Sequence, residues 1–279
     1  MIQLIQIELS KVFSRTRTYI GFIAIAILVL VLEIAFYLDG NRFIDFATQS
    51  LDQSFIFTGK LMNGYLVCFI VLQSLIIHVP LLVSLVAGEL LAGEATSGTF
   101  RFLLTRPISR TQVVSAKFIA ACMYTIALVL WLSFVSLGLG KLLFGSGDLI
   151  VMKTDMITIF SADDVMWRFG CAFLFAMLSM CTIASLALLF SSLVENAVGP
   201  IVSTMVVVIV FVVISAMDVQ ILNNVKPLLF TTHMNAWKLF FEETLDKQAI
   251  LTSALVLLGH ILAFLGITIV VFNKKDVLS

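Results

Sequence analysis

The sequence predicts an all-α integral membrane protein, and three observations support that prediction. Of the 279 residues, 61% are hydrophobic and only 12% are charged, about half the share of charge found in soluble domains. Six apolar runs are long enough to cross a bilayer, because about twenty helical residues span its hydrocarbon core. The sequence lacks the short alternating strands of a membrane barrel. Residues 1–279 are therefore predicted as one transmembrane domain.

The N-terminal segment, residues 1–17, has the pattern of an amphipathic helix that precedes the first apolar run. Apolar side chains recur at helical spacing at Ile2, Ile5, Leu9, Val12 and Phe13. Gln, Ser and Lys residues fill the opposite side, and two arginines follow the helix. Such a helix is expected to lie in the membrane interface. The alternative is that this segment is the irregular start of the first span.

The six apolar runs are predicted to be membrane-spanning helices within residues 19–272. Their bounds are Tyr19–Leu38, Gly64–Ala87, Val113–Leu137, Trp167–Leu193, Val198–Met217 and Ala249–Phe272. An even number of spans places both termini on one side. The loops share the 17 lysines and arginines almost evenly between the two sides. The shorter inner segments and the basic termini favour a cytoplasmic location for both termini.

The last outer segment, residues 218–248, is too apolar for free solvent and too interrupted to be a span. We expect it to form short helices in the outer membrane interface. Trp237 is expected at the depth of the lipid headgroups, where tryptophan is enriched.

The inner segment between the second and third runs begins with GEATSGTFRF, residues 93–102. Its Gly-x-x-x-x-Gly spacing resembles a phosphate-binding loop, but such a loop needs lysine directly after the second glycine. Thr99 follows Gly98 instead, so nucleotide binding is not expected. The pattern predicts a turn at Gly98, then a short helix that Pro107 ends, because the residue before proline avoids helical geometry. Ser109 is expected to cap the third span.

Three arginines, Arg101, Arg106 and Arg110, follow that turn. Two interpretations fit them. The arginines either fix membrane topology as a positive inner loop, or they dock a cytoplasmic protein through forked contacts with carboxylates.

Other chemistry is not predicted. The net charge is zero, which leaves no basic surface for nucleic acid. The four cysteines all lie in apolar runs, and neither they nor the histidines have metal-ligand spacing. We find no nucleophile–base pair and no paired carboxylates placed for hydrolysis, so no catalytic residue is expected.

Two polar residues inside the spans are candidates for a transport pathway. Glu33 lies within the first span, where a charged group costs about 2.5–3.5 kcal/mol at the bilayer centre; alternatively it reaches the headgroups. His78 lies two residues before Pro80, which kinks a helix and frees a backbone carbonyl. His78 either satisfies that carbonyl or contacts a ligand.

The inner segment resembles the corresponding loop of ABC-2 type transporter permeases. The residues that carry the resemblance are Glu94, Gly98-Thr99, Leu103-Leu104, Arg106-Pro107-Ile108-Ser109-Arg110 and Lys117. Three further stretches resemble the same family in the same order along the chain. They are SSLVENAVGPI (191–201), KPLLFTTHMNAWKLFF (226–241) and VFNKKDV (271–277).

The resemblance implies the permease subunit of an ATP-driven exporter in the plasma membrane, here a bacterial inner membrane. Two permeases would pair, as two copies or as a copy and a paralogue, and two ATPase subunits would dock from the cytoplasm. The chain would bind no cofactor, since ATP and Mg belong to the ATPase. The inner segment would be the coupling helix. Its coupling residues would be Glu94, Gly98, Thr99, Arg101, Arg106, Pro107 and Arg110.

The alternative function is a membrane-embedded enzyme or a secondary transporter without an ATPase. Such a protein should carry several ionisable residues inside its spans. Apart from Lys117 and Arg168 near the ends of their runs, only Glu33, His78 and His260 lie there. The nearly featureless spans favour an amphipathic, lipidic or peptide cargo over a sugar or a small ion.

Overall fold

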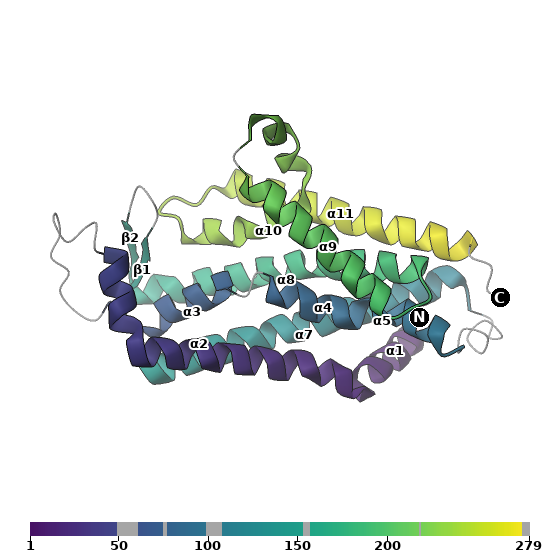
Figure 1. The fold of residues 1–279 in the computed structure, drawn as a ribbon, viewed down its shortest axis with the longest axis horizontal. Helices are drawn as coiled ribbons and strands as arrows, with labels where there is room; N and C mark the ends of the chain where they lie inside the picture. Colours follow the sequence, from purple (N-terminus) through teal and green to yellow (C-terminus); the bar gives the residue numbers. More distant parts are fainter. Residues whose placement is uncertain (49–60, 75–76, 99–107, 153–156, 218, 275–279) are drawn as a thin grey trace.

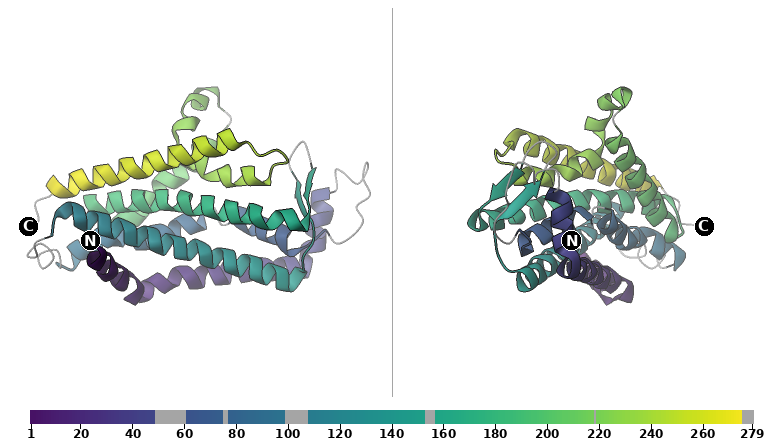
Figure 2. Two further views of the ribbon diagram at one scale, coloured as in Figure 1. Left: turned by 180° about the vertical axis from the view of Figure 1, so that it is seen from behind. Right: turned by 60° about the vertical axis from the view of Figure 1, so that its left-hand side comes forward.

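The computed structural model describes residues 1–48, 61–74, 77–98, 108–152, 157–217 and 219–274. These residues form an elongated bundle of helices with both termini at the same end (Figures 1 and 2). A small hairpin lies at the opposite end. The predicted all-α membrane class is therefore confirmed.

Five helices are long and apolar enough to cross a membrane. They are α2 (Thr16–Thr48), α7 (Arg110–Phe144), α8 (Ala162–Leu193), α9 (Val198–Ala216) and α11 (Lys247–Lys274). The second predicted span is two helices, α3 (Gly64–Ser74) and α4 (His78–Ala87), bent by 58°. The described residues thus hold five candidate spans, or six if the bent pair counts as one. Six spans stay a prediction.

The bend in the second span is consistent with the position of Pro80. Pro80 lies in the first turn of α4, where its missing N–H costs no helical hydrogen bond. The Nδ1 atom of His78 lies 3.2 Å from the carbonyl oxygen of Ser74, in the preceding helix. A carbonyl only accepts, so this ring nitrogen donates and joins the two helices across the bend.

The N-terminal helix α1 (Ile2–Ser14) is separate from the first span. Arg15 has extended backbone geometry between α1 and α2, so α1 is not the first turn of that span. Of the predicted apolar face, Val12 is buried while Ile2 is 74% exposed. Glu8 is buried beside Val12, which the apolar pattern did not predict.

Helix α8 forms the centre of the bundle. In the most apolar stretch of α8, 67% of the residues are buried inside the protein. The corresponding shares are 17% for α9 and 22% for α11. Helices α7, α4 and α11 pack around it. Because lipid rather than water surrounds such a bundle, the exposed apolar faces of α9 and α11 need no protein cover of their own.

The hairpin at the end of the bundle opposite the two termini is a feature that the sequence did not predict. Strands β1 (Leu149–Met152) and β2 (Ile157–Phe160) are antiparallel, with Leu149 opposite Phe160. Asn63 joins the hairpin to α3. Its side-chain amide donates to the carbonyl of Asp148 at 2.7 Å, while its oxygen accepts from the first backbone N–H groups of α3.

The segment between α9 and α11 folds into short helices, as expected. They are η1 (Gln220–Asn224), η2 (Lys226–Leu228), α10 (Phe230–Met234) and η3 (Asn235–Phe241). The predicted headgroup depth of Trp237 is wrong. Trp237 is buried and lines a small cavity of about 40 Å³ with Val129 of α7 and Ala176 of α8. These partners lie near the middle of their helices.

Close packing of α3 on α7 generates a first prediction. A Cβ atom on Gly64 would lie 2.5 Å from the backbone of Gly140, so the two helices would have to separate. We expect Gly64→Ala to lower the free energy of unfolding by about 1–3 kcal/mol, as overpacking does. The measurement is the thermal unfolding midpoint of the detergent-purified protein. Gly138→Ala is the control, because no atom lies within 4 Å of its added Cβ. Equal midpoints for the two variants would contradict the close approach.

Candidate functional site

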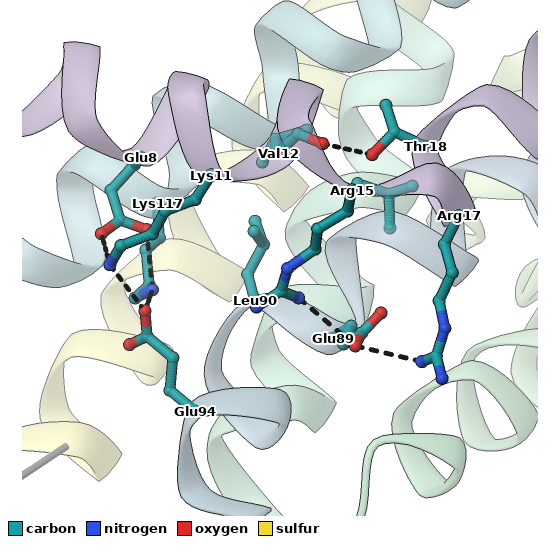
Figure 3. Close-up of a pocket in the computed structure, with 11 residues that line it drawn as sticks. Glu8, Lys11, Val12, Arg15, Arg17, Thr18, Glu89, Leu90, Glu94 and Lys117 are labelled. Atoms are coloured by element: carbon teal, nitrogen blue, oxygen red, sulfur yellow. Dashed lines mark hydrogen bonds and ion pairs between the residues drawn. The ribbon is translucent and has the colours of Figure 1, made fainter. Parts of the chain in front are cut away.

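Four charged side chains from three helices meet at the end of the bundle that holds both termini (Figure 3). Glu8 and Lys11 come from α1, Glu94 from α5 (Glu89–Thr96) and Lys117 from α7. We call these four residues the charge cluster.

Each carboxylate in the charge cluster contacts both ammonium groups. The Nζ atom of Lys117 lies 2.8 Å from Glu8 Oε2 and 2.7 Å from Glu94 Oε1. The Nζ atom of Lys11 lies 2.6 Å from Glu8 Oε1 and 2.9 Å from Glu94 Oε1. Two negative and two positive groups give the cluster a net charge of zero.

The charge cluster is mostly buried. The side chains of Lys117 and Glu8 are 1% and 2% exposed, that of Glu94 is 6% exposed, and Lys11 alone reaches solvent. Charged groups are removed from water only where partners compensate them. Burial alone would raise the pKa of Glu8, but Lys117 and Lys11 outweigh it and hold that pKa below its ordinary value. Burial would likewise lower the pKa of Lys11, but hydrogen bonds to Glu8 and Glu94 raise it.

Helical spacing explains how these residues converge. Glu8 precedes Val12 by four residues and Lys11 by three, so all three share the side of α1 that faces the bundle. Lys117 follows Arg110 by seven residues, or two turns, on α7. Helix α1 packs along this part of α7, which brings Glu8 to Lys117.

A second set of ion pairs joins α5 to the junction of α1 and α2. Glu89 Oε1 lies 3.3 Å from Arg15 Nη1 and 3.1 Å from Arg17 Nη1. The hydroxyl of Thr18 donates to the carbonyl of Val12 and so closes the corner between the two helices. Figure 3 shows both sets of contacts on one side of α5.

Helix α8 holds the other side of α5. The hydroxyl of Ser191 accepts from the backbone N–H groups of Leu91 and Ala92, at 3.1 and 2.9 Å, and donates to the carbonyl of Gly88. Leu91 lies in the first turn of α5, where the N–H groups have no partner inside the helix. At the other end of α5, the Thr96 hydroxyl donates to the carbonyl of Glu195. Helix α5 is therefore fixed at both ends.

The crevice between these charged residues is too small for a cargo molecule. Its volume is about 20 Å³, which is room for about one water molecule. The charge cluster therefore serves to join helices rather than to bind a ligand. In the part of the chain that the structure describes, no group of three or more His, Cys, Asp or Glu residues could hold a metal ion.

Of the predicted coupling residues, Glu94 and Gly98 lie at and just after the end of α5. The side chain of Glu94 pairs with two lysines, Lys11 and Lys117. Gly98 has a φ of +68°, a left-handed conformation that glycine adopts readily. This confirms the predicted turn. Among the described residues, no atom lies within 4 Å of a Cβ built on Gly98, so the left-handed conformation is the observed reason for glycine there.

The remaining predicted coupling residues divide into two groups. Thr99, Arg101, Arg106 and Pro107 lie outside the described residues. Arg110 begins α7, after the predicted Ser109 cap, which forms a capping box with Gln112. The Nη1 atom of Arg110 donates to the carbonyls of Phe272 and Asn273, at 3.1 and 3.2 Å. Arg110 thus ties the start of α7 to the end of α11, where a cation is favoured.

The two pathway candidates are separate from the charge cluster. Glu33 is 0% exposed in α2, and neither carboxylate oxygen has a hydrogen-bond partner among the described residues. It lies within electrostatic range of Cys68 in α3, whose thiol is 3.4 Å from the Ser136 hydroxyl of α7. His78 is exposed at the bend of the second span.

The role of Glu8 was not predicted from the sequence. A signal was present, because Glu8 stands at helical spacing among the apolar residues of α1. A carboxylate on an apolar face needs a cation. Lys117, inside an apolar run, needs an anion for the same reason. Spacing within each helix could not show that the two residues meet, since 109 positions separate them.

Comparison with known proteins identifies one family. A model of ABC-2 family transporter proteins matches residues 5–277. The chain is also 24% identical over 197 residues to YhcI, an uncharacterized protein of Bacillus subtilis (strain 168). That alignment covers 69% of this chain and 63% of the relative's length, so the chain matches less than two thirds of that protein.

The charge cluster generates a second prediction, tested by a double-mutant cycle. Glu8→Leu or Lys117→Met alone leaves a buried charge uncompensated, which costs about 3–5 kcal/mol. The double variant keeps the neutral Lys11–Glu94 pair, so we expect it to lose less stability than the sum of the single variants, by about 1–3 kcal/mol. The free energy of unfolding in detergent is the measurement.

Arg17→Gln is the matched control at the same end of the bundle. Its side chain is 63% exposed, and exposed ion pairs contribute under about 1 kcal/mol. Strictly additive losses for Glu8 and Lys117 would show that the two residues do not act as a pair.

Proposed function

Since this chain belongs to the ABC-2 family of transporter proteins, and so is the permease component of an ABC transporter, we propose that it exports its cargo with energy from a separate ATPase. Two ATPase subunits would dock from the cytoplasm on a pair of permeases. ATP and Mg would bind to those subunits and not to this chain.

The attachment of α5 is the observation that supports this proposal. Helix α5 leads directly to Gly98 and the segment 99–107, which the family resemblance identifies as the coupling helix. Glu94 joins α5 to α1 and α7, and Ser191 joins it to α8. A force on segment 99–107 would therefore reach three other helices through α5.

The contacts divide the proposed coupling residues by role. Arg101 and Arg106, with Thr99 and Pro107, are proposed to form the surface that meets the ATPase. Glu94 and Arg110 have partners inside the chain, so we propose that they position that surface. Gly98 supplies the turn that lets the chain leave α5.

For the cargo pathway we propose Glu33 and His78, which are polar groups in apolar helices away from the charge cluster. The exposed apolar faces of the spans favour an amphipathic, lipidic or peptide cargo. The alternative function, an enzyme or a secondary transporter without an ATPase, would not explain why α5 is attached to three other helices.

We further propose that both termini face the cytoplasm of a bacterial cell and that the chain lies in its inner membrane. The short inner segments and both termini carry basic residues, as cytoplasmic segments do. The charge cluster lies at the same end, where an ATPase could exert force on α5.

The third prediction tests docking with Arg101→Ala/Arg106→Ala. Truncating forked arginine contacts at an interface costs about 2–5 kcal/mol of binding. We therefore expect at least a tenfold loss of the ATPase that co-purifies with the wild-type permease, at equal membrane expression. The isolated chain should show no saturable ATP binding.

Arg110→Ala is tested separately, because it also releases the end of α11. The control is Arg17→Ala, which also removes a basic residue at the same end of the bundle. This variant should retain the ATPase. Undiminished co-purification and normal transport by the Arg101/Arg106 variant would show that these arginines only set topology.

A further inference from the structure

Glu33 places a carboxyl group inside the apolar part of α2. It is the eighteenth of the 33 residues of this helix. It lies within the stretch Thr16–Gly40, which is long and apolar enough to cross a membrane. The side chain is completely buried, and neither carboxylate oxygen has a hydrogen-bond partner among the described residues. Glu33 is therefore a buried acid that no hydrogen bond of the described chain stabilises.

Two uncharged polar groups from neighbouring helices lie in the same region as Glu33. Cys68 of α3 is within electrostatic range of the Glu33 carboxyl group. The Sγ atom of Cys68 lies 3.4 Å from the Oγ atom of Ser136 in α7, and both of these side chains are completely buried. A thiol and a hydroxyl can form hydrogen bonds, but they carry no positive charge. Helices α2, α3 and α7 thus meet near Glu33 without supplying a cation.

The cations of the helices that pack against α2 are used elsewhere. These helices are α1, α3, α4 and α7. The lysines of the charge cluster pair with its two carboxylates at the end of the bundle that holds both termini. Lys141 of α7 lies over the ring of Tyr65 in α3, with its Nζ atom 5.0 Å from the ring centroid. Neither site offers Glu33 a positive charge.

The other titratable groups of these helices are also occupied or exposed. Tyr124 of α7 packs edge-on against Phe22, which is three turns of α2 away from Glu33. His78 of α4 is exposed, and so are Tyr37 and Asp39 of α2. Burial is the only influence that the described residues exert on the ionisation of Glu33. A negative charge on Glu33 would therefore have no counter-ion.

The surroundings of Glu33 favour the neutral form of its carboxyl group. In the most apolar stretch of α2 only 22% of the residues are buried inside the protein, so the solvent beyond this helix is lipid rather than water. Neither lipid nor apolar side chains stabilise an unpaired carboxylate, whereas a protonated acid costs much less to bury. Since the side chain is completely buried, a proton is also a ligand small enough to be bound without displacing a neighbouring helix.

We propose that Glu33 is a proton-binding site, which holds a proton while α2, α3 and α7 enclose it and releases that proton to water when ATP binding separates these helices. The inference rests on the proposed function, because an exporter opens its bundle to release cargo. Once water reaches Glu33, the acid ionises at neutral pH, since a carboxyl group of an exposed glutamate has a pKa of about 4.3. Closing the bundle takes one proton back.

Proton binding makes the opening of the bundle dependent on pH. The closed form holds one proton more than the open form at any pH above the ordinary value for glutamate. Raising the pH by one unit therefore favours the open form tenfold, until the pH at which the buried acid also ionises. Acid favours the closed form. Glu33→Gln cannot release a proton, so this part of the pH dependence should be lost in that variant.

The test, and the fourth prediction, is infrared spectroscopy of the transporter in lipid bilayers at neutral pH. The carbonyl stretch of a protonated carboxyl group is separate in frequency from that of a carboxylate. We expect a protonated-acid band in the wild type that is absent from Glu33→Gln. Glu243→Gln is the matched control and should keep the band, because Glu243 is exposed. Glu33→Asp keeps an acid and should shift the band, which assigns the band even if Glu33→Gln fails to fold.

The same samples are then measured with an ATP analogue that the ATPase cannot hydrolyse. We expect the Glu33 band to disappear when the analogue binds and to return when it is removed. Wild-type and Glu33→Gln spectra without a difference in the protonated-acid region, or an Asp variant without a shift, would overturn the proposal. A band that persists in the analogue-bound transporter would overturn it as well.

Co-purification of the ATPase separates this inference from the proposed function. If the ATPase is retained while Glu33 shows no protonated-acid band, the proton-binding site is wrong and the proposed function stands. If Glu33 shows the band but no ATPase joins the permease, the proposed function fails, and the ATP-driven release of the proton fails with it.

Discussion

The arrangement at the end of the bundle that holds both termini depends on one buried cation, the ammonium group of Lys117. It lies inside the first turns of a membrane-spanning helix, where neither water nor lipid can stabilise its charge. Glu8 from α1 and Glu94 from α5 must therefore both reach it. This requirement fixes α1 against the bundle and α5 beside α7.

The position of α5 gives this constraint a consequence for transport. Helix α5 has only eight residues, too few to be stable on its own, so its orientation comes from its neighbours. Ser191 stabilises its first turn, and Glu94 anchors its last turn to Lys117. The segment that we propose as the coupling helix follows α5, and it is thus attached to a unit made of α1, α5 and the start of α7. In our account the ATPase moves this unit as one body.

The all-α membrane class and the positions of the long apolar helices could be predicted from the sequence. A run of about twenty apolar residues has few alternatives to a membrane helix. The turn at Gly98 and the cap at Ser109 were also predictable, since both depend on local backbone chemistry. The hairpin was not, because four-residue runs such as Leu149–Met152 are too short to show a period. The depth of Trp237 and the pairing of Glu8 with Lys117 depend on which helices are neighbours. Such contacts leave no local pattern in a single sequence.

The central claim is that the charge cluster makes α1, α5 and α7 move together, and a distance measurement tests it most directly. Paramagnetic labels at Gln6 of α1 and Thr111 of α7, both exposed, would be placed in the assembled transporter. Pulsed electron resonance would compare the nucleotide-free and ATP-bound states. The account predicts an unchanged Gln6–Thr111 distance, while the distance between the two Thr111 labels of the paired permeases changes. A Gln6–Thr111 distance that shifts when ATP binds would contradict it.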